Sequence, residues 1–254
     1  MASATTELPA ADIIVDELPS SGIFNMSMDA ALLQLAAERE RSIVRIYQWS
    51  EPTVTLGYFQ GAGQAVASPF PGLPVVRRLS GGGAILHDQE LTYSLVLPAS
   101  HPARQEPSGV YSTVHQAIIQ LLSNAGVPCQ LRSDFEAMNS HTRVTNTANV
   151  AEPFLCFLRK NANDIVHASG HKIVGSAQRR RKGVTLQHGS IILKASRMVP
   201  QVPGIKELES TFLDSDFRHS LPGIIARSIS HSTNFRSYSE EEKWLAAAIA
   251  AERR

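Results

Sequence analysis

The stretch 170–191 constrains the fold of this chain more than any other part of the sequence. Lys172 opens an apolar run that leads into three small residues, Gly175-Ser176-Ala177, and a second apolar run carries Gln187-His188-Gly189. Core strands rarely contain so many glycine and polar residues, whereas a pocket in which the backbone approaches a ligand needs such residues. The pattern predicts two strands that line a pocket, with a turn at the small residues and a basic loop after it.

The remaining sequence mixes helices and strands without regular alternation. Apolar residues recur at helical spacing and predict helices over 25–39, 109–125, 205–212 and 239–253. Short runs rich in β-branched and aromatic residues predict strands at 43–48, 53–57, 75–78, 84–87, 91–97, 165–168, 173–174 and 184–193. Residues 133–150 are polar and predict a loop. The predicted fold class is therefore α+β, with a mixed, mostly antiparallel sheet flanked by helices.

Bulk properties describe an ordinary globular chain. Its 254 residues suit a flexible N-terminal tail over 1–20 and one domain over 21–254. The net charge of +1 gives no global field that points to nucleic acid or a membrane. Two cysteines, no apolar stretch of membrane-spanning length and no signal peptide predict a cytoplasmic protein.

Three consecutive glycines, Gly81-Gly82-Gly83, follow a predicted strand. Their exposed N–H groups can hold a phosphate or a carbonyl oxygen. The pattern matches neither phosphate-loop fingerprint, and a loose hairpin bend is the alternative. Arg77-Arg78 before the glycines and His87-Asp88 after them favour a binding site.

Cys156 lies in an apolar run, where a cysteine is usually a buried small side chain. A nucleophilic cysteine needs a partner that lowers its pKa or removes its proton, and Lys172 lies across one predicted hairpin. Lys172 itself is either a solvated strand lysine or a functional group. His167 and His171 are spaced like helix-borne metal ligands, but a predicted turn separates them, so no metal site is predicted.

Together these pieces resemble the superfamily of lipoate A/B and biotin protein ligases. The run Arg77-Arg78-Leu79-Ser80-Gly81-Gly82-Gly83-Ala84-Ile85-Leu86-His87 is similar to its arginine–glycine–histidine signature, and Gly170 to Ala177 is similar to its lysine motif. Residues 25–29 and 56–60 also fit, so the similarity spans roughly residues 23–250. The resemblance implies the catalytic-domain fold of these ligases, with a sheet around an acyl tunnel.

Within the superfamily, the sequence resembles the cysteine-dependent octanoyltransferases. Cys156 before Lys172, and the run 186–191 with Gln187 and His188, are similar to that branch. ATP-using ligases have Asp-x-Gly-Asn after the histidine, and His87 is followed by a different sequence. In contrast, Asn163-Asp164 resembles the ligases.

The resemblance implies transfer of an octanoyl group from octanoyl-acyl carrier protein to a lysine of a lipoyl domain, such as glycine cleavage H protein, without a cofactor. Cys156 is expected to carry the acyl group, with Lys172 as base or as partner of the thiolate. Substrate contacts are expected from Arg78, Gly81, Gly82, Gly83, His87, Gly175, Ser176, Ala177, Gln187 and His188. The basic run 179–182 is either a solvated loop or a docking site for an acidic protein.

Three alternatives remain open at this stage. An ATP-dependent lipoate ligase would use Lys172 on an acyl-adenylate and leave Cys156 without a role. An amidotransferase that moves octanoyl between lipoyl domains would share the chemistry and differ in its donor. A non-catalytic binder of lipoyl domains or carriers is disfavoured by the presence of Cys156, Lys172 and the three glycines together.

Overall fold

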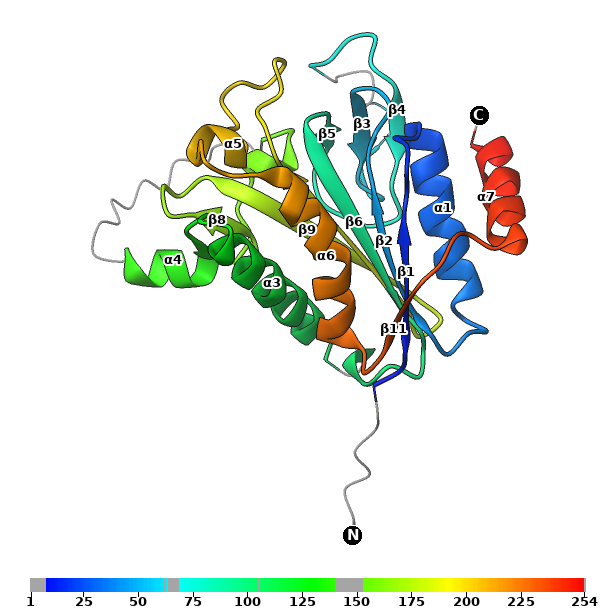
Figure 1. The fold of residues 1–254 in the computed structure, drawn as a ribbon. Coiled ribbons are helices and arrows are strands. Elements are labelled where there is room, and N and C mark those ends of the chain that lie inside the picture. Colours follow the sequence, from blue (N-terminus) through cyan, green and yellow to red (C-terminus); the bar gives the residue numbers. More distant parts are fainter. Residues whose placement is uncertain (1–7, 62, 64–68, 105, 140–152, 254) are drawn as a thin grey trace.

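The computed structural model describes residues 8–61, 63, 69–104, 106–139 and 153–253. Its main element is an eight-stranded sheet with the order β11-β1-β2-β6-β10-β9-β8-β7 (Figure 1). The strands in this order are Thr233–Phe235, Ala11–Val15, Ser42–Tyr47, Glu90–Leu97, Val184–Ile192, Lys172–Arg181, Ile165–His167 and Cys129–Leu131. β1 is parallel to both of its neighbours, β11 and β2, and every other pair in this sheet is antiparallel. The predicted α+β class with a mixed, mostly antiparallel sheet is confirmed.

A second, three-stranded sheet lies beside the first. It contains β4 (Val75–Arg77), β3 (Thr53–Leu56) and β5 (Ile85–His87) in that order. β3 is parallel to β4 and antiparallel to β5. Because the glycine run 81–83 connects β4 to β5, this small sheet determines where the glycines lie.

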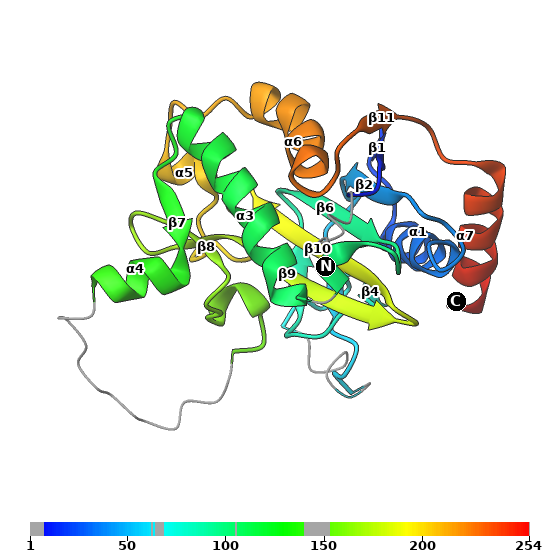
Figure 2. The same cartoon turned by 90° about the horizontal axis from the view of Figure 1, so that it is seen from below.

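Helices cover both faces of the large sheet (Figure 2). The two helices on one face are α3 (Pro107–Asn124) and α6 (Asp214–Ile229), and those on the other side are α1 (Gly22–Leu35) and α7 (Glu240–Glu252). Two short helices, α4 (Arg132–Met138) and α5 (Ile205–Leu208), and two 3-10 turns, η1 (Pro102–Arg104) and η3 (Cys156–Leu158), complete the described elements. No helix in the described ranges is long and apolar enough to cross a bilayer.

The alternation of β6 explains this layering. Tyr93, Leu95 and Leu97 belong to the core beneath α3 and α6, whereas Val96 belongs to the core beneath α1. Successive strand residues point to opposite faces, and β6 is buried along its whole length. A central strand with helices on both sides is therefore buried on both faces, and in β6 this burial includes the polar residues Glu90, Thr92 and Ser94.

Several predicted boundaries were wrong. Residues 175–177 were predicted as a turn, but β9 continues through them, and the chain reverses only at Lys182-Gly183, where φ is 50° and 84°. Residues 11–15, expected within a flexible tail, form β1, and Ala11 and Ile13 are fully buried. Residues 132–138 form α4 where a loop was predicted, and 140–152 lie outside the described residues. The pairing of β1 with β2 is a long-range interaction, which local propensity does not encode.

The predicted helices and most strands are confirmed with shifted ends. α1 begins at Gly22, three residues before the predicted start, because the Ser21 side chain caps it by accepting from the Phe24 N–H. The predicted hairpin between β8 and β9 is confirmed, with Gly170 at a positive φ of 86°. The helix predicted over 205–212 is reduced to α5, and α6, β7 and β11 were not predicted.

Candidate functional site

A cavity lies where the small sheet and η3 meet β9 and β10. It is lined by Met26, Tyr47, Arg78, Ile85, His87, Thr92, Cys156, Phe157, Lys172, Gly175, Ser176, Ala177, His188, Gly189 and Ser190. Besides Cys156, the cavity brings together seven residues that were predicted for the site: Arg78, His87, Lys172, Gly175, Ser176, Ala177 and His188. The three glycines 81–83 do not line the cavity directly, but Gly82 lies beside its nucleophile candidate.

Cys156 begins η3 and is held by the chain on both sides. Its N–H donates to the Ala84 carbonyl at 2.7 Å, and the Ala84 N–H donates to the Phe154 carbonyl at 3.1 Å. A Cβ atom on Gly82 would lie 3.8 Å from the Cys156 Sγ, and Gly82 has a positive φ of 94°. Only glycine adopts this conformation readily, so the glycine run lies directly against the thiol.

The glycine run is shaped by Arg78. Its guanidinium Nη2 donates to the carbonyls of Gly81 and Gly83, both at 2.7 Å, and Nη1 donates to the Thr55 carbonyl at 3.1 Å. Burial lowers the pKa of Arg78 to about 10, while the charge of Cys156 acts in the opposite direction. Arg78 therefore remains a cation at neutral pH, and it lies close enough to Cys156 to interact with a thiolate formed there.

Two carbonyls of the glycine run, those of Gly81 and Gly83, accept from Arg78, and the N–H groups of the run are not engaged by it. Within the described residues, no acceptor is paired with the N–H of Gly81, Gly82 or Gly83. Gly57 permits this close packing, because a Cβ on Gly57 would lie 2.1 Å from the Gly82 carbonyl oxygen. Unpaired N–H groups beside a thiol form a site that can stabilise a developing oxyanion.

Lys172 is the second buried cation at the cavity. Its ammonium lies 2.8 Å from the Asp164 carboxylate and donates to the Cys156 carbonyl oxygen at 3.3 Å. Burial raises the pKa of Asp164, whereas Lys172 and, more weakly, Arg132 lower it. A Cβ on Gly175 would lie 2.5 Å from the Lys172 Cε, so this glycine leaves the space that the lysine side chain occupies. The ammonium is thus directed at the backbone of the nucleophile.

His115 on α3 links the two segments that hold this ion pair, and the sequence analysis missed it. Its Nδ1 lies 2.5 Å from the Asn163 carbonyl, and its Nε2 lies 2.7 Å from the Ser176 Oγ. Because a carbonyl only accepts, Nδ1 carries the proton and Nε2 accepts from Ser176. Burial lowers the pKa of His115 to about 4, which keeps the ring neutral. A lone histidine beside the apolar face of a predicted helix was the only signal for it.

His87 lines the cavity and belongs to a network of buried hydrogen bonds. Its ring stacks on Trp49 at 3.9 Å, Nδ1 lies 2.6 Å from Glu90, and Nε2 lies 2.9 Å from the Thr55 hydroxyl. Thr92 joins the network by donating to Glu90 and accepting from Trp49. Both ring nitrogens of His87 are therefore occupied, and the ring contributes a fixed wall of the cavity.

His188 belongs to a neighbouring buried network around Asp29. The His188 Nε2 bonds to the Ser80 hydroxyl, and its Nδ1 lies 3.7 Å from Asp29. Asp29 also accepts from Tyr47 at 2.9 Å and from Arg45 at 3.1 Å. Burial lowers the pKa of His188, so the imidazole is neutral at physiological pH. This network ties the glycine segment to β10 and α1.

Gln187 is not brought to the cavity. It is fully buried, donates to the Tyr93 hydroxyl at 3.1 Å and accepts from Gln178 at 2.9 Å. Tyr93 belongs to the core beneath α3, on the opposite face of the sheet from His188. Successive side chains of β10 point to opposite faces, so the neighbours 187 and 188 are separated. The sequence motif that contains both residues therefore supplies one structural residue and one residue of the cavity.

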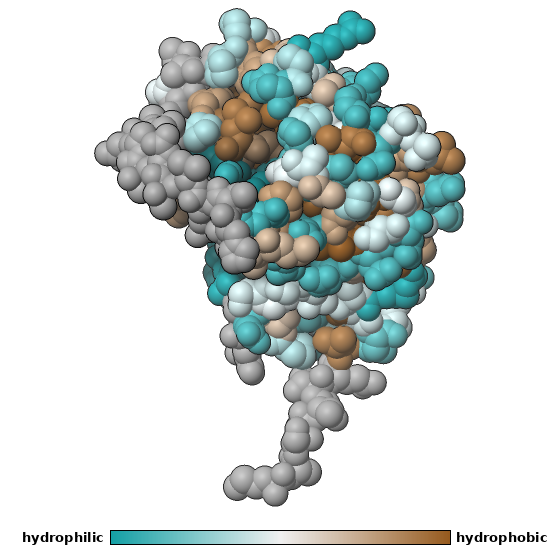
Figure 3. Space-filling model, turned by 90° about the vertical axis from the view of Figure 1, so that its left-hand side faces the viewer, coloured by the Kyte–Doolittle hydropathy of each residue, from teal (hydrophilic) through white to brown (hydrophobic). Residues whose placement is uncertain are grey.

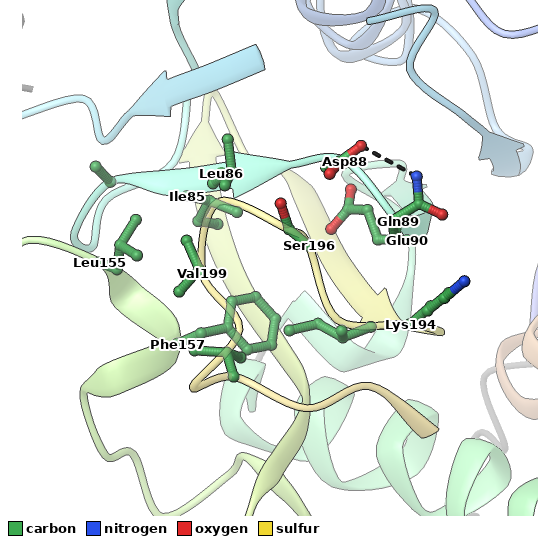
Figure 4. A pocket seen from close by; sticks show the side chains of 13 residues that line it. Ile85, Leu86, Asp88, Gln89, Glu90, Leu155, Phe157, Lys194, Ser196 and Val199 are labelled. Atoms are coloured by element: carbon green, nitrogen blue, oxygen red, sulfur yellow. Dashed lines mark hydrogen bonds between the residues drawn. The ribbon is translucent and has the colours of Figure 1, made fainter. Parts of the chain in front are cut away.

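A second, more open pocket adjoins the first (Figure 4). The two share Ile85 and Phe157. Apolar Leu155 and Val199 face these residues, and Asp88, Gln89, Glu90, Lys194 and Ser196 line the polar side. Apolar surface is also concentrated in the upper half of the face in Figure 3. In the described ranges, no three His, Cys, Asp or Glu side chains are placed to hold a metal ion.

Solved structures with this fold include several lipoate protein ligases. Protein Ta0514 from Thermoplasma acidophilum, with bound lipoic acid, superposes with a TM-score of 0.72 at 19% identity, covering 96% of this chain and 95% of that one. A lipoate-protein ligase A with bound ATP gives a TM-score of 0.70 at 19% identity, with 96% and 95% coverage. At this level of identity the likeness concerns the fold.

Curated relatives are more similar in sequence. Octanoyltransferase LipM of Anoxybacillus flavithermus is 36% identical over 184 residues, covering 70% of this chain and 64% of the relative. The LipM of Geobacillus kaustophilus is 38% identical over 176 residues, covering 67% and 61%, and that of Bacillus subtilis is 34% identical over 186 residues, covering 70% and 64%. The chain thus spans somewhat less than two thirds of the length of these relatives.

A family model also matches most of the chain. The model of the lipoyl protein ligase A/B catalytic domain covers residues 21–211. This range includes the glycine run, Cys156, Lys172 and the two strands β9 and β10 that line the cavity. The chain therefore belongs to the lipoyl protein ligase A/B catalytic domain family.

Proposed function

We propose that this protein is an octanoyltransferase that moves an octanoyl group from octanoyl-acyl carrier protein to a lysine of a lipoyl domain. The observation that carries the proposal is a cysteine thiol against a glycine run whose N–H groups have no acceptor among the described residues, next to the buried cations Arg78 and Lys172. Similarity to three LipM octanoyltransferases supports the same reaction.

In the first half-reaction, the Cys156 thiolate attacks the carbonyl carbon of the octanoyl thioester. The bond to the carrier sulfur breaks, and the carrier thiolate leaves and takes up the proton that Cys156 lost. The octanoyl group is then a thioester on Cys156. A covalent stage separates the two carriers in time, so they need not bind together.

In the second half-reaction, the neutral amine of the acceptor lysine attacks the same carbonyl. An amide forms, the bond to the Cys156 sulfur breaks, and the departing thiolate accepts the proton of the amine. Formation of an amide from a thioester is favourable, so the transfer needs neither ATP nor a cofactor. The acceptor in this proposal is a lipoyl domain or glycine cleavage H protein.

Both half-reactions pass through a tetrahedral oxyanion, and the glycine N–H groups are proposed to stabilise it. Losing one such donor costs about 3 kcal/mol of transition-state stabilisation. Arg78 is proposed to stabilise the thiolate. The cavity wall of Met26, Tyr47, Ile85 and Phe157 is suited to an alkyl chain.

Lys172 is proposed to act as a cation. Its ammonium is paired with the Asp164 carboxylate at 2.8 Å, and an ammonium has no lone pair with which to remove a proton. Its contact with the Cys156 carbonyl supports a role in holding η3 and in favouring negative charge at the reacting end.

The proposal is tested by mixing the protein with octanoyl-acyl carrier protein and a lipoyl domain, with and without ATP. We expect octanoyl amide on the acceptor at the same rate in both mixtures. A product that forms only from free acid and ATP would identify a ligase, and a product that forms only from an octanoylated lipoyl domain would identify an amidotransferase.

A further inference from the structure

A charged and aromatic surface begins at the edge of the cavity and extends to the β9–β10 turn. We define this arm-side surface as Tyr58, Phe59, Arg179, Arg181 and Lys182. Successive side chains of β9 point to opposite faces, so every second residue shares a face. Gly175 and Ala177 of the cavity wall are therefore followed on the same face by Arg179 and Arg181. The last two, with Lys182 and Tyr58, line an outer groove.

Close contacts connect this surface to the thiol. The Arg179 guanidinium lies 4.2 Å from the centre of the Tyr58 ring, and the Tyr58 and Phe59 rings are 5.1 Å apart. The Phe59 ring is 3.8 Å from where a Cβ on Gly81 would be. The next residue, Gly82, is the one against the Cys156 Sγ. The surface therefore leads along the glycine run to the nucleophile.

The aromatic part of the surface is unusually exposed. Phe59 is 83% exposed and Tyr58 is 42% exposed. Exposed aromatic rings next to arginine are the composition typical of binding hot spots in protein interfaces. An 83% exposed phenylalanine close to a catalytic thiol is most simply explained by a partner that covers it.

The charged part is a local excess of cations. In the described parts of the chain, Arg179, Arg181 and Lys182 form no ion pair with a carboxylate, whereas surface cations such as Arg41, Lys206 and Lys243 do. The same groove also contains Arg253, and its carboxylates are Glu38 and Glu252. Four cations against two carboxylates stand out in a chain whose net charge is only +1.

We propose that the arm-side surface docks the acidic carrier protein that delivers the octanoyl thioester, which deepens the proposed function and rests on it. The six residues from Ala177 to Lys182 span about 16 Å, because each of the five steps along an extended strand advances about 3.3 Å. A pantetheine arm bridges such a distance between a docked carrier and Cys156. An acceptor lysine side chain is too short for that, which is why the surface is assigned to the donor.

The test compares two donors with the same thioester, octanoyl-acyl carrier protein and octanoyl-pantetheine, which has no protein part. Octanoylation of Cys156 is followed by intact mass in single turnovers. The variant is R181E/K182E, and the matched control is K206E/R227E on α5 and α6, which changes the net charge equally. Arg179 is left unchanged because it packs on Tyr58.

We expect R181E/K182E to lower the second-order rate with the carrier by on the order of tenfold or more, with the rate from octanoyl-pantetheine unchanged. The wild-type rate with the carrier should fall as salt rises, and the variant rate should fall less. K206E/R227E should match the wild type with both donors.

The proposal is contradicted if R181E/K182E slows both donors equally, slows neither, or raises the KM for the lipoyl-domain acceptor instead. These outcomes leave the proposed function intact as long as wild-type Cys156 becomes octanoylated. Wild-type Cys156 that stays unmodified with both donors contradicts the proposed function and the docking surface together.

Discussion

Two regions beside the cavity differ in how completely their polar groups are hydrogen-bonded. We call the buried networks of Asp29 and His87 the deep end, and Cys156 with the glycine run 81–83 the reacting end. At the deep end, Asp29 accepts from Arg45 and Tyr47, and both ring nitrogens of His87 have partners. At the reacting end, no described acceptor is paired with the N–H groups of Gly81–Gly83. A saturated network fixes shape, whereas unpaired donors retain their capacity to bind charge. We therefore expect substitutions at the reacting end to alter rate and substitutions at the deep end to alter stability.

The largest effect should come from the reacting end. Cys156→Ala is expected to reduce octanoyl transfer by about 10⁴-fold or more, because the covalent route disappears. Its urea unfolding curve should be close to that of the wild type. Cys129→Ala is the matched control, since Cys129 lies on β7 away from the cavity and burial raises its pKa to about 12. Equal losses in the two variants would contradict the assignment.

Substitutions in the Lys172–Asp164 pair should affect both the transfer rate and the stability of the fold. Lys172→Met is expected to lower the transfer rate by about 10²-fold. Leaving a buried charge without its partner costs about 3–5 kcal/mol in the free energy of unfolding. The double variant Lys172→Met/Asp164→Asn should recover part of the stability and none of the rate. Recovery of the rate in the double variant would show that Lys172 acts only through the fold.

At the deep end, a substitution should affect stability more than it affects the rate. Asp29→Asn is expected to lower the free energy of unfolding by about 3 kcal/mol, because the fully buried Arg45 keeps only Asp16 as a charged partner. The rate of Cys156 octanoylation, measured where the variant is fully folded, should fall by less than about tenfold. A loss of rate comparable to that of Lys172→Met would remove the distinction between the two ends.

The smallest effect should be the pH dependence that His115 adds. Its pKa is about 4 in the folded protein and 6.5 is the ordinary value. The unfolded chain therefore takes up the proton first as the pH falls. This contribution to stability is complete above pH 6.5 and is lost towards pH 4, and it amounts to about 3 kcal/mol.

His115→Gln isolates that contribution. A glutamine can donate to the Asn163 carbonyl and accept from Ser176, but it does not titrate. The difference between the wild-type and variant free energies of unfolding should change between pH 6.5 and 4 and be constant above. A constant difference across the whole range would contradict a neutral, buried His115.

Sequence reasoning anticipated short local motifs better than contacts between distant segments. The glycine run, Cys156 and Lys172 lie in short local motifs, and local motifs are visible in one sequence. Asp29 and His115 act through partners 16 or more positions away, as shown by the contacts of Asp29 with Arg45 and of His115 with Asn163 and Ser176. Such pairings depend on tertiary packing, which a single sequence does not display.

The strand boundaries show the same limit. Gly175-Ser176-Ala177 has the composition of a turn, yet pairing with β10 from Val174 to Arg181 keeps it extended. The sequence also placed Gln187 and His188 together, but strand alternation puts them on opposite faces. The sequence thus predicted which residue types lie in this region, whereas the direction in which each side chain points depends on the register of the sheet.

The most direct test of the central claim is intact mass spectrometry of the wild-type protein after mixing with octanoyl-acyl carrier protein. We predict a mass increase of one octanoyl group, located on Cys156, removed by hydroxylamine, and transferred to an added lipoyl domain without ATP. Formation of octanoylated acceptor while Cys156 remains unmodified throughout the reaction would contradict it.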